Sequence, residues 1–241
     1  MTVPYLDGVA ASVPGRTYKQ RAVDLLDLGP GMDAVDLGCG PGTDLAALAD
    51  AVGADGTVVG IDRDDAMLAT ARDRTAGRPW VTLRHGDLHE LPLDDAGADR
   101  AHTDRVLQHV ADPARALAEI RRVLRPGGRV VLAEPDWDAL LVDTPDPAAG
   151  RGLARFVTTE VVRNATIGRS LARLCAEAGL DVVTVEAHAA VFRDVETAER
   201  ILGVRRNFAR AVRAGYVDAE PDLSGPFLAS ALIFLTVAER S

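Results

Sequence analysis

Residues 35–42 of the chain read Val-Asp-Leu-Gly-Cys-Gly-Pro-Gly, and this stretch decides the fold. The apolar residues that lead into Gly38 are typical of a short buried strand, and the apolar spacing from Leu45 to Val52 predicts a helix directly afterwards. Glycines between a strand and a helix let the backbone approach a ligand where side chains would collide. The stretch therefore predicts a strand–turn–helix unit with a ligand at its turn, and a nicotinamide dinucleotide is still possible at this point.

Strands and helices alternate beyond this turn as well. Apolar segments predict further strands at 57–62, 81–83, 98–104 and 129–135, with amphipathic helical segments between most of them. The segment 98–104 is unusually polar for a central strand, because it contains Asp99, Arg100 and His102. Strands that alternate with helices indicate βαβ units around a parallel sheet, so the predicted fold class is α/β.

The second half of the chain, beyond Pro135, has a mostly helical periodicity. Strand-like segments occur only at 182–185, 191–193 and 232–238, and the apolar spacing from Ile201 to Val212 predicts one further helix. The sequence contains no internal repeat and no low-complexity linker. We therefore expect a single domain over residues 1–241.

Acidic residues stand at the ends of the first three predicted strands. Asp36 comes two residues before Gly38, Asp62 ends the second strand, and Asp87 follows the third strand after Gly86. A carboxylate at the end of the second strand can accept hydrogen bonds from both hydroxyls of a ribose. The glycine turn and the three acids together predict a nucleoside site rather than a tight turn alone.

The spacing of the glycines argues against a dinucleotide in this site. A dinucleotide turn has the pattern GxGxxG, whereas here the third glycine comes one residue early, behind Pro41. Asp44 also places a negative charge in the first turn of the next helix, where a pyrophosphate would bind. The pattern favours a nucleoside that carries an uncharged or cationic substituent.

The motifs of the first half resemble one large enzyme family. They are the segments 36–42, 60–62, 86–88, 107–109 and 122–128, in this order. With them the chain resembles the class I S-adenosylmethionine-dependent methyltransferases, in particular the group that modifies small molecules and quinones. The resemblance implies a Rossmann-like, doubly wound sheet of seven strands whose last strand, at 232–238, is antiparallel. It also implies a cofactor-binding half at 1–135 and helical insertions over the acceptor site at 136–167 and 194–228.

The resemblance implies S-adenosyl-L-methionine as the cofactor and S-adenosyl-L-homocysteine as its product. It assigns the three glycines of the turn to the methionine moiety, Asp62 to the ribose, Asp87 with Leu88 to the adenine, and Asp104 with Arg105 to the surroundings of the sulfonium. The complete set of expected cofactor-binding residues is Asp36, Gly38, Cys39, Gly40, Gly42, Asp62, Arg63, Met67, Gly86, Asp87, Leu88, Asp104, Arg105 and Gln108.

A sulfonium is already an activated methyl donor, so the protein has mainly to align the acceptor with it. His109 follows the fourth strand, where its imidazole could take a proton from a hydroxyl or an amine, and we expect it to be the catalytic base. The alternative role for His109 is packing or capping. Trp137 and Asp138 are expected beside the acceptor, and no metal site is expected because the five histidines have no ligand spacing.

Composition excludes several other classes of protein. The 36 acidic residues outnumber the 27 basic residues, and this balance argues against a nucleic-acid partner. The sequence has no apolar run of about 18 residues and no visible signal peptide, so no membrane partner and a cytoplasmic location are expected. We expect a small-molecule acceptor, a role in secondary metabolism, and a monomer or a homodimer.

Two other functions remain open at this stage. An enzyme of the same fold could bind S-adenosylmethionine and catalyse a cyclisation or a decarboxylation instead, because a fold does not determine a reaction. A nicotinamide oxidoreductase is disfavoured by the glycine spacing and by the absence of a catalytic Tyr/Lys pair.

Overall fold

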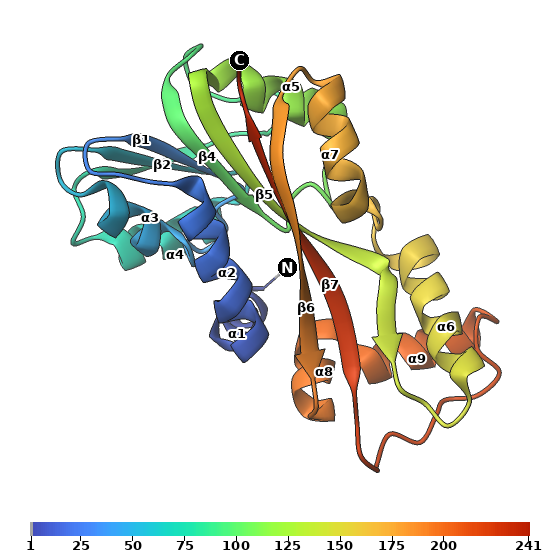
Figure 1. The fold of residues 1–241 in the computed structure, drawn as a ribbon. Coiled ribbons are helices and arrows are strands. Elements are labelled where there is room, and N and C mark those ends of the chain that lie inside the picture. The colour runs from blue at the N-terminus through green and yellow to red at the C-terminus, as the bar shows by residue number, and fades with distance from the viewer. Residues whose placement is uncertain (1) are drawn as a thin grey trace.

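A seven-stranded mixed sheet forms the centre of the computed structural model, which describes residues 2–241 (Figure 1). The strands are β1 Asp33–Leu37, β2 Thr57–Asp62, β3 Val81–His85, β4 Ala98–Asp104, β5 Leu124–Val142, β6 Asp181–Phe192 and β7 Ala229–Glu239. Their order is β3-β2-β1-β4-β5-β7-β6; the first five are parallel, and β7 is antiparallel to both β5 and β6. The predicted Rossmann-like sheet with an antiparallel last strand is thus confirmed.

Helices flank this sheet and cover its extensions. They are α1 Val3–Ala11, α2 Val13–Leu26, α3 Leu45–Val52, α4 Asp65–Thr75, α5 Pro113–Val123, α6 Pro147–Phe156, the π-helix η1 Val157–Val161, α7 Ile167–Glu177, α8 Val195–Leu202 and α9 Val204–Arg213. Asp64 accepts hydrogen bonds from the backbone amides of Ala66 and Met67 at the start of α4. Asp112 caps α5 in the same way, as its position before Pro113 predicts.

Three elements of the second half differ from the sequence-based expectation. Strand β5 is much longer than the predicted 129–135, and β6 is one strand where two segments were predicted. The predicted helix over 201–212 is interrupted at Gly203, whose φ of +64° ends α8 in a left-handed conformation before α9 begins.

Strands β5, β6 and β7 extend beyond the parallel part of the sheet and carry a second core (Figure 1). This core contains Leu140 of β5, Phe192 of β6 and Ala229 of β7, packed against Leu153 of α6 and Phe208 of α9. The helices of the regions 136–167 and 194–228 therefore pack on the extended ends of strands that belong to the main sheet. Within residues 2–241 the structure contains no helix that is both long and apolar enough to span a membrane.

Candidate functional site

A cavity of about 730 Å³ lies where the parallel strands end. Carboxyl ends of parallel strands meet at one edge of a sheet, which is the usual place for a ligand in such folds. The sequence-predicted residues that line the cavity are Asp36, Gly38, Cys39, Gly40, Asp62, Arg63, Met67, Gly86, Asp87, Leu88, Asp104, Arg105 and His109. Four separate loops thus contribute to one site.

Two residues from the predicted set lie outside this lining. Gly42 has a φ of +80°, and a Cβ there would come within 3.1 Å of the side chain of Ala71, so this glycine lets the turn pack against α4. Gln108 is buried behind the site, where its amide donates to the carbonyl of Arg105 and its Oε1 accepts from Trp137 Nε1 at 2.8 Å. A binding role for these two residues stays a prediction.

Hydrogen bonds to β2 hold the glycine turn in place. The amides of Gly38 and Cys39 both donate to the carbonyl of Ile61, at 2.7 and 2.9 Å. Gly38 has a φ of +74°, and a Cβ there would lie 2.5 Å from the side chain of Val106. The turn therefore requires glycine at position 38 for its conformation and for its contact with the loop after β4.

Asp62 is held by the turn that it faces. Its Oδ2 accepts from the amide of Gly40 at 2.8 Å, and its Oδ1 accepts from the amide of Asp64 at 2.9 Å. Each carboxylate oxygen has two lone-pair sites, so both oxygens can accept one more donor. This arrangement fits the two hydroxyls of a ribose.

Asp36 provides a buried acceptor with no partner. Its Oδ1 contacts His102 Nδ1 at 2.9 Å, whereas its Oδ2 is buried and has no hydrogen-bond partner within residues 2–241. Asp36 is a lining residue of the cavity, and a buried carboxylate oxygen without a partner is best satisfied by a positively charged or hydrogen-bond-donating ligand group. Asp36 therefore fits the positively charged part of S-adenosylmethionine.

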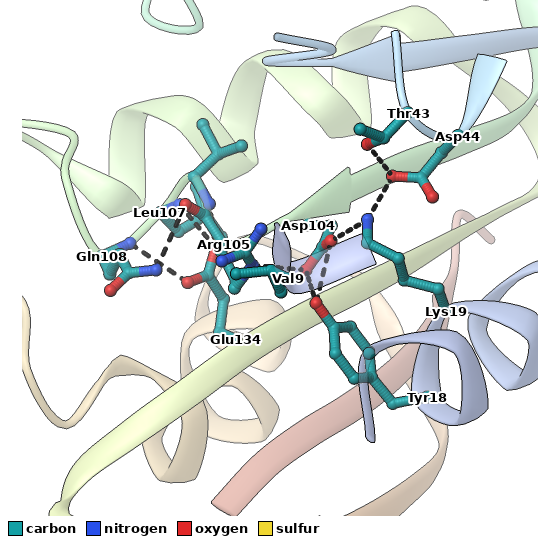
Figure 2. Close-up of polar contacts among 12 residues, drawn as sticks. Val9, Tyr18, Lys19, Thr43, Asp44, Asp104, Arg105, Leu107, Gln108 and Glu134 are labelled. Atoms are coloured by element: carbon teal, nitrogen blue, oxygen red, sulfur yellow. Dashed lines mark hydrogen bonds and ion pairs between the residues drawn. The ribbon is translucent and has the colours of Figure 1, made fainter. Parts of the chain in front are cut away.

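A buried cation on α2, Lys19, neutralises two acids beside the cavity (Figure 2). Its Nζ lies 2.6 Å from Asp44 Oδ2 and 2.5 Å from Asp104 Oδ2, and the hydroxyl of Tyr18 lies 3.2 Å from both oxygens of Asp104. Burial alone would raise the pKa of Asp104, but the charges of Lys19 and Arg105 lower it to about 2. Asp104 is therefore ionised at neutral pH, with its charge balanced by α2.

Lys19 and Tyr18 are site residues that sequence reasoning missed. Lys19 is the only lysine in the sequence, where every other basic side chain of this type is arginine. This exception was the available sequence signal for a special role of Lys19. Its partners stand 25 and 85 residues away in the sequence, so no local pattern connects them.

Glu134 fixes the loop between β4 and α5 (Figure 2). Its carboxylate is fully buried and accepts from the backbone amides of Val106, Leu107 and Gln108, at 2.7, 2.5 and 3.3 Å. Burial raises the pKa of Glu134 to about 8, although the three amides favour its ionised form. An acid inside the apolar segment 129–135 was the sequence signal for this role.

His109 is exposed to the cavity from the loop that Glu134 holds. Its backbone amide donates to the carbonyl of Val106, and its ring has no hydrogen-bond partner within the described residues 2–241. Partial burial of the ring and the positive charges of Arg105 and Arg63 lower the pKa of His109. The imidazole is therefore neutral, and able to accept a proton, at pH 7.

The remaining wall of the cavity comes from elements that the motifs do not include. Leu6 of α1, beside Gly40 of the glycine turn, and residues 158–163, in and after the π-helix η1, complete the lining. Trp137 and Asp138, which were expected beside the acceptor, are not part of this lining: Trp137 contacts Gln108 and Asp138 pairs with Arg169 at 3.2 Å. In the described part of the chain, no three potential ligands are grouped as a metal site.

Comparisons of sequence place the chain among methyltransferases. A family model described as a methyltransferase domain matches residues 35–132. An uncharacterized 37.1 kDa protein of transposon TN4556 from Streptomyces fradiae is 51% identical over 246 residues, which cover 99% of this chain and 71% of that protein. The demethylmenaquinone methyltransferase of Staphylococcus aureus (strain MRSA252) is 36% identical over 137 residues, 57% of each chain, so the match spans little more than half of that enzyme.

Comparisons of structure agree on the fold. A protein of Bacillus halodurans C-125 assigned to the methyltransferases superposes with a TM-score of 0.70 at 17% identity, over 93% of this chain and all of its own. The geranyl diphosphate C-methyltransferase of Streptomyces coelicolor A3(2) has a TM-score of 0.65 at 18% identity, over 94% of this chain and 76% of that enzyme. The [4+2]-cyclase SpnF has a TM-score of 0.61 at 19% identity, over 94% of this chain and 81% of the cyclase.

The glycine turn, the acids at the strand ends, the sheet order and the relatives all lead to one assignment. The chain belongs to the class I S-adenosylmethionine-dependent methyltransferases.

Proposed function

We propose that this enzyme transfers the methyl group of S-adenosylmethionine to a small, largely apolar organic acceptor, of quinone or natural-product type. The observation that carries the proposal is that one cavity is lined by two sets of residues, from the strand ends and from outside the motifs. Acidic groups on the strand ends form one wall, and α1 with residues 158–163 forms the other. The first suits a cationic nucleoside, and the second encloses a substrate.

The acidic wall assigns roles to residues of this chain. Asp62 would bind the ribose hydroxyls, and Asp87 with Leu88 would contact the adenine. The free oxygen of Asp36 and the ionised Asp104 would face the positively charged end of the cofactor, beside the backbone of Gly38 and Gly40. When bound, the cofactor supplies an activated methyl group.

The other wall supports an apolar acceptor. Its apolar side chains are Leu6, Val161 and Val162, and Val110 adjoins them from the loop after β4. Thr158, Thr159, Glu160 and Arg163 add polar and charged groups that can orient the acceptor. Pockets with mostly apolar linings and a few placed polar groups bind small organic ligands. The similarity to a demethylmenaquinone methyltransferase supports a ring-containing acceptor of this kind.

His109 would act as the general base for an oxygen or nitrogen acceptor. Its neutral ring, which has no partner within residues 2–241, faces the cavity and can hold the proton that leaves the acceptor as the methyl group arrives. A carbon acceptor or an ionised oxygen needs no such step, and alignment by the cavity walls would then suffice.

Binding of the cofactor tests the first part of the proposal. Calorimetry should show that Asp62→Ala weakens binding of S-adenosylhomocysteine about 10- to 150-fold, because a charged hydrogen-bond pair contributes about 1.5–3 kcal/mol. Asp73→Ala is the matched control, since Asp73 is exposed on α4 and does not line the cavity. Equal affinities in all three proteins would remove Asp62 from the site.

Transfer of the methyl group tests the second part and separates it from a cyclisation. The enzyme is incubated with methyl-labelled S-adenosylmethionine and a panel of reduced naphthoquinones and phenols. We expect S-adenosylhomocysteine and an acceptor that gains one methyl group in equal amounts. A product of unchanged mass, formed while the cofactor stays intact, would identify a non-transfer enzyme of the same fold, as the similarity to a cyclase allows.

A further inference from the structure

Strand β6 is an exposed edge of the sheet. It has 12 residues, and within residues 2–241 only β7 pairs with it. The side chains of Val185 and Val191 are 44% and 45% exposed. A long edge strand with exposed apolar side chains offers unpaired backbone groups to any other strand, and proteins usually protect such edges with charges or short lengths.

The exposed side chains of β6 share one face. Pairing with β7 is regular from Thr184 to Phe192, after a bulge between Val182 and Thr184. Alternate residues along this stretch are Val185, Ala187, Ala189 and Val191, all apolar and all exposed. The other face carries Thr184, Glu186, His188 and Ala190, which are buried or half-buried.

The sequence of this stretch is complementary to itself in the antiparallel direction. When a second copy of β6 is placed antiparallel with Ala187 opposite Ala187, Val185 lies opposite Ala189 on the exposed face. On the other face Thr184 then lies opposite Ala190, and Glu186 lies opposite His188. Every position meets a residue of compatible size, and the one acidic side chain meets the one basic ring.

The charges around Ala187 are also complementary in this antiparallel arrangement. Within one chain, Glu186 accepts from Arg21 of α2 at 2.5 Å and lies 3.2 Å from His188 Nε2. The hydrogen bond from Arg21 lowers the pKa of Glu186 to about 2, so this carboxylate is ionised. A two-fold axis through Ala187 would place each Glu186 between Arg21 of its own chain and His188 of the partner.

We propose that two copies of the enzyme form a dimer in which their β6 strands pair antiparallel about a two-fold axis at Ala187. The two sheets become one continuous sheet, in which the free backbone groups of the two β6 strands pair and their apolar side chains pack beside one another on one face. A single self-complementary patch of this kind gives a closed dimer in which neither β6 edge stays free.

Cysteine cross-linking tests the register directly. Residues that lie directly opposite in an antiparallel pair have Cα atoms about 4.5–5.5 Å apart, which is within the range of a disulfide. Ala187→Cys should therefore form a disulfide-linked dimer under mild oxidation. Ala189→Cys is the matched control, because its own copy would be four residues away along the strand, about 13 Å. The native Cys39 and Cys175 are buried and do not compete.

Sedimentation measures the dimer itself. The wild-type protein should sediment at twice the 25.5 kDa of one chain at micromolar concentration, and Val185→Lys should shift it to the monomer. Val13→Lys is the control, since Val13 is 69% exposed on α2 and is not part of the paired strand. A wild-type monomer at 200 µM, or cross-linking of Ala189→Cys in place of Ala187→Cys, would overturn the proposal and leave β6 to another occupant. Circular dichroism of each variant confirms that it is folded.

Discussion

His102 Nδ1 lies 2.9 Å from Asp36 Oδ1, and both side chains are buried beneath the glycine turn. The two residues are register partners on the adjacent strands β4 and β1. Burial alone would lower the pKa of His102, but the hydrogen bond to Asp36 and the surrounding carboxylates raise it overall. The pair explains why the fourth strand is polar: it supplies the partner that one acid of the site requires.

Stability should depend on pH through this pair. A histidine whose pKa is raised by folding stabilises the protein fully below its unfolded pKa of about 6.5, and this contribution is lost as pH rises through the folded pKa. The free energy of unfolding of the wild type should therefore fall above neutral pH relative to that of His102→Leu. At pH 6, His102→Leu should cost about 3–5 kcal/mol, because it leaves a buried carboxylate unpaired. Urea denaturation from pH 5.5 to 8.5 measures both effects, with the exposed His85→Leu as the control.

Replacement of Lys19 should destabilise the protein strongly. Lys19→Met leaves Asp44 and Asp104 as neighbouring buried acids without their cation, which should cost about 3–5 kcal/mol. Arg16→Met changes an exposed cation on the same helix and should alter stability by less than about 0.5 kcal/mol. Thermal denaturation of the three proteins decides the point, and equal losses in the two variants would contradict a special role for Lys19.

Glu134 should affect both stability and its pH dependence. Glu134→Gln presents an NH₂ group to backbone amides, so at least one buried donor loses its acceptor at a cost of about 1–3 kcal/mol. The folded pKa of about 8 exceeds the ordinary value of 4.5, so the contribution of Glu134 to stability declines as pH rises through about 8. Stability curves from pH 6 to 9.5 should be flatter for the glutamine variant. Parallel curves for the two proteins would show that Glu134 does not titrate in this range.

Removal of the imidazole at position 109 should slow transfer to an oxygen or nitrogen acceptor. General-base catalysis contributes about 10²–10⁴-fold, so His109→Ala should lower turnover by such a factor with little change in cofactor affinity. The pKa of His109 lies below the ordinary 6.5, so the base becomes protonated and the wild-type rate falls only at a pH below that value. The variant should lack this acidic limb. A variant within threefold of the wild type that keeps its acidic limb would assign His109 to packing.

The cofactor side of the cavity was predictable because its signals are local. Strand ends and the turns that follow them stand together in the sequence, so the glycine turn, Asp62 and Asp87 could be identified from short patterns, and all of them line one cavity. Side-chain direction was not predictable in this way. Gln108 is adjacent to His109 in the sequence, yet its side chain points away from the cavity toward Trp137.

The second half was harder to predict because tertiary contacts decide its elements. Glu186 and His188 interrupt the apolar run of β6, so the strand was predicted as two pieces; at the edge of the sheet these polar residues are tolerated beside Arg21. The apolar period of α8 and α9 continues across Gly203, which hides the break between them. The network of Lys19 joins three elements whose contact only the folded chain reveals.

The long strands β5, β6 and β7 also determine how the molecule can move. Strands β6 and β7 stay paired with each other from the parallel body into the second core, whereas the pairing of β5 with β7 is interrupted between Asp136 and Leu141. The paired strands β6 and β7 therefore join the two halves as one frame. Entry and release of the acceptor would then depend on the pieces that complete the cavity outside the strand ends, α1 and residues 158–163.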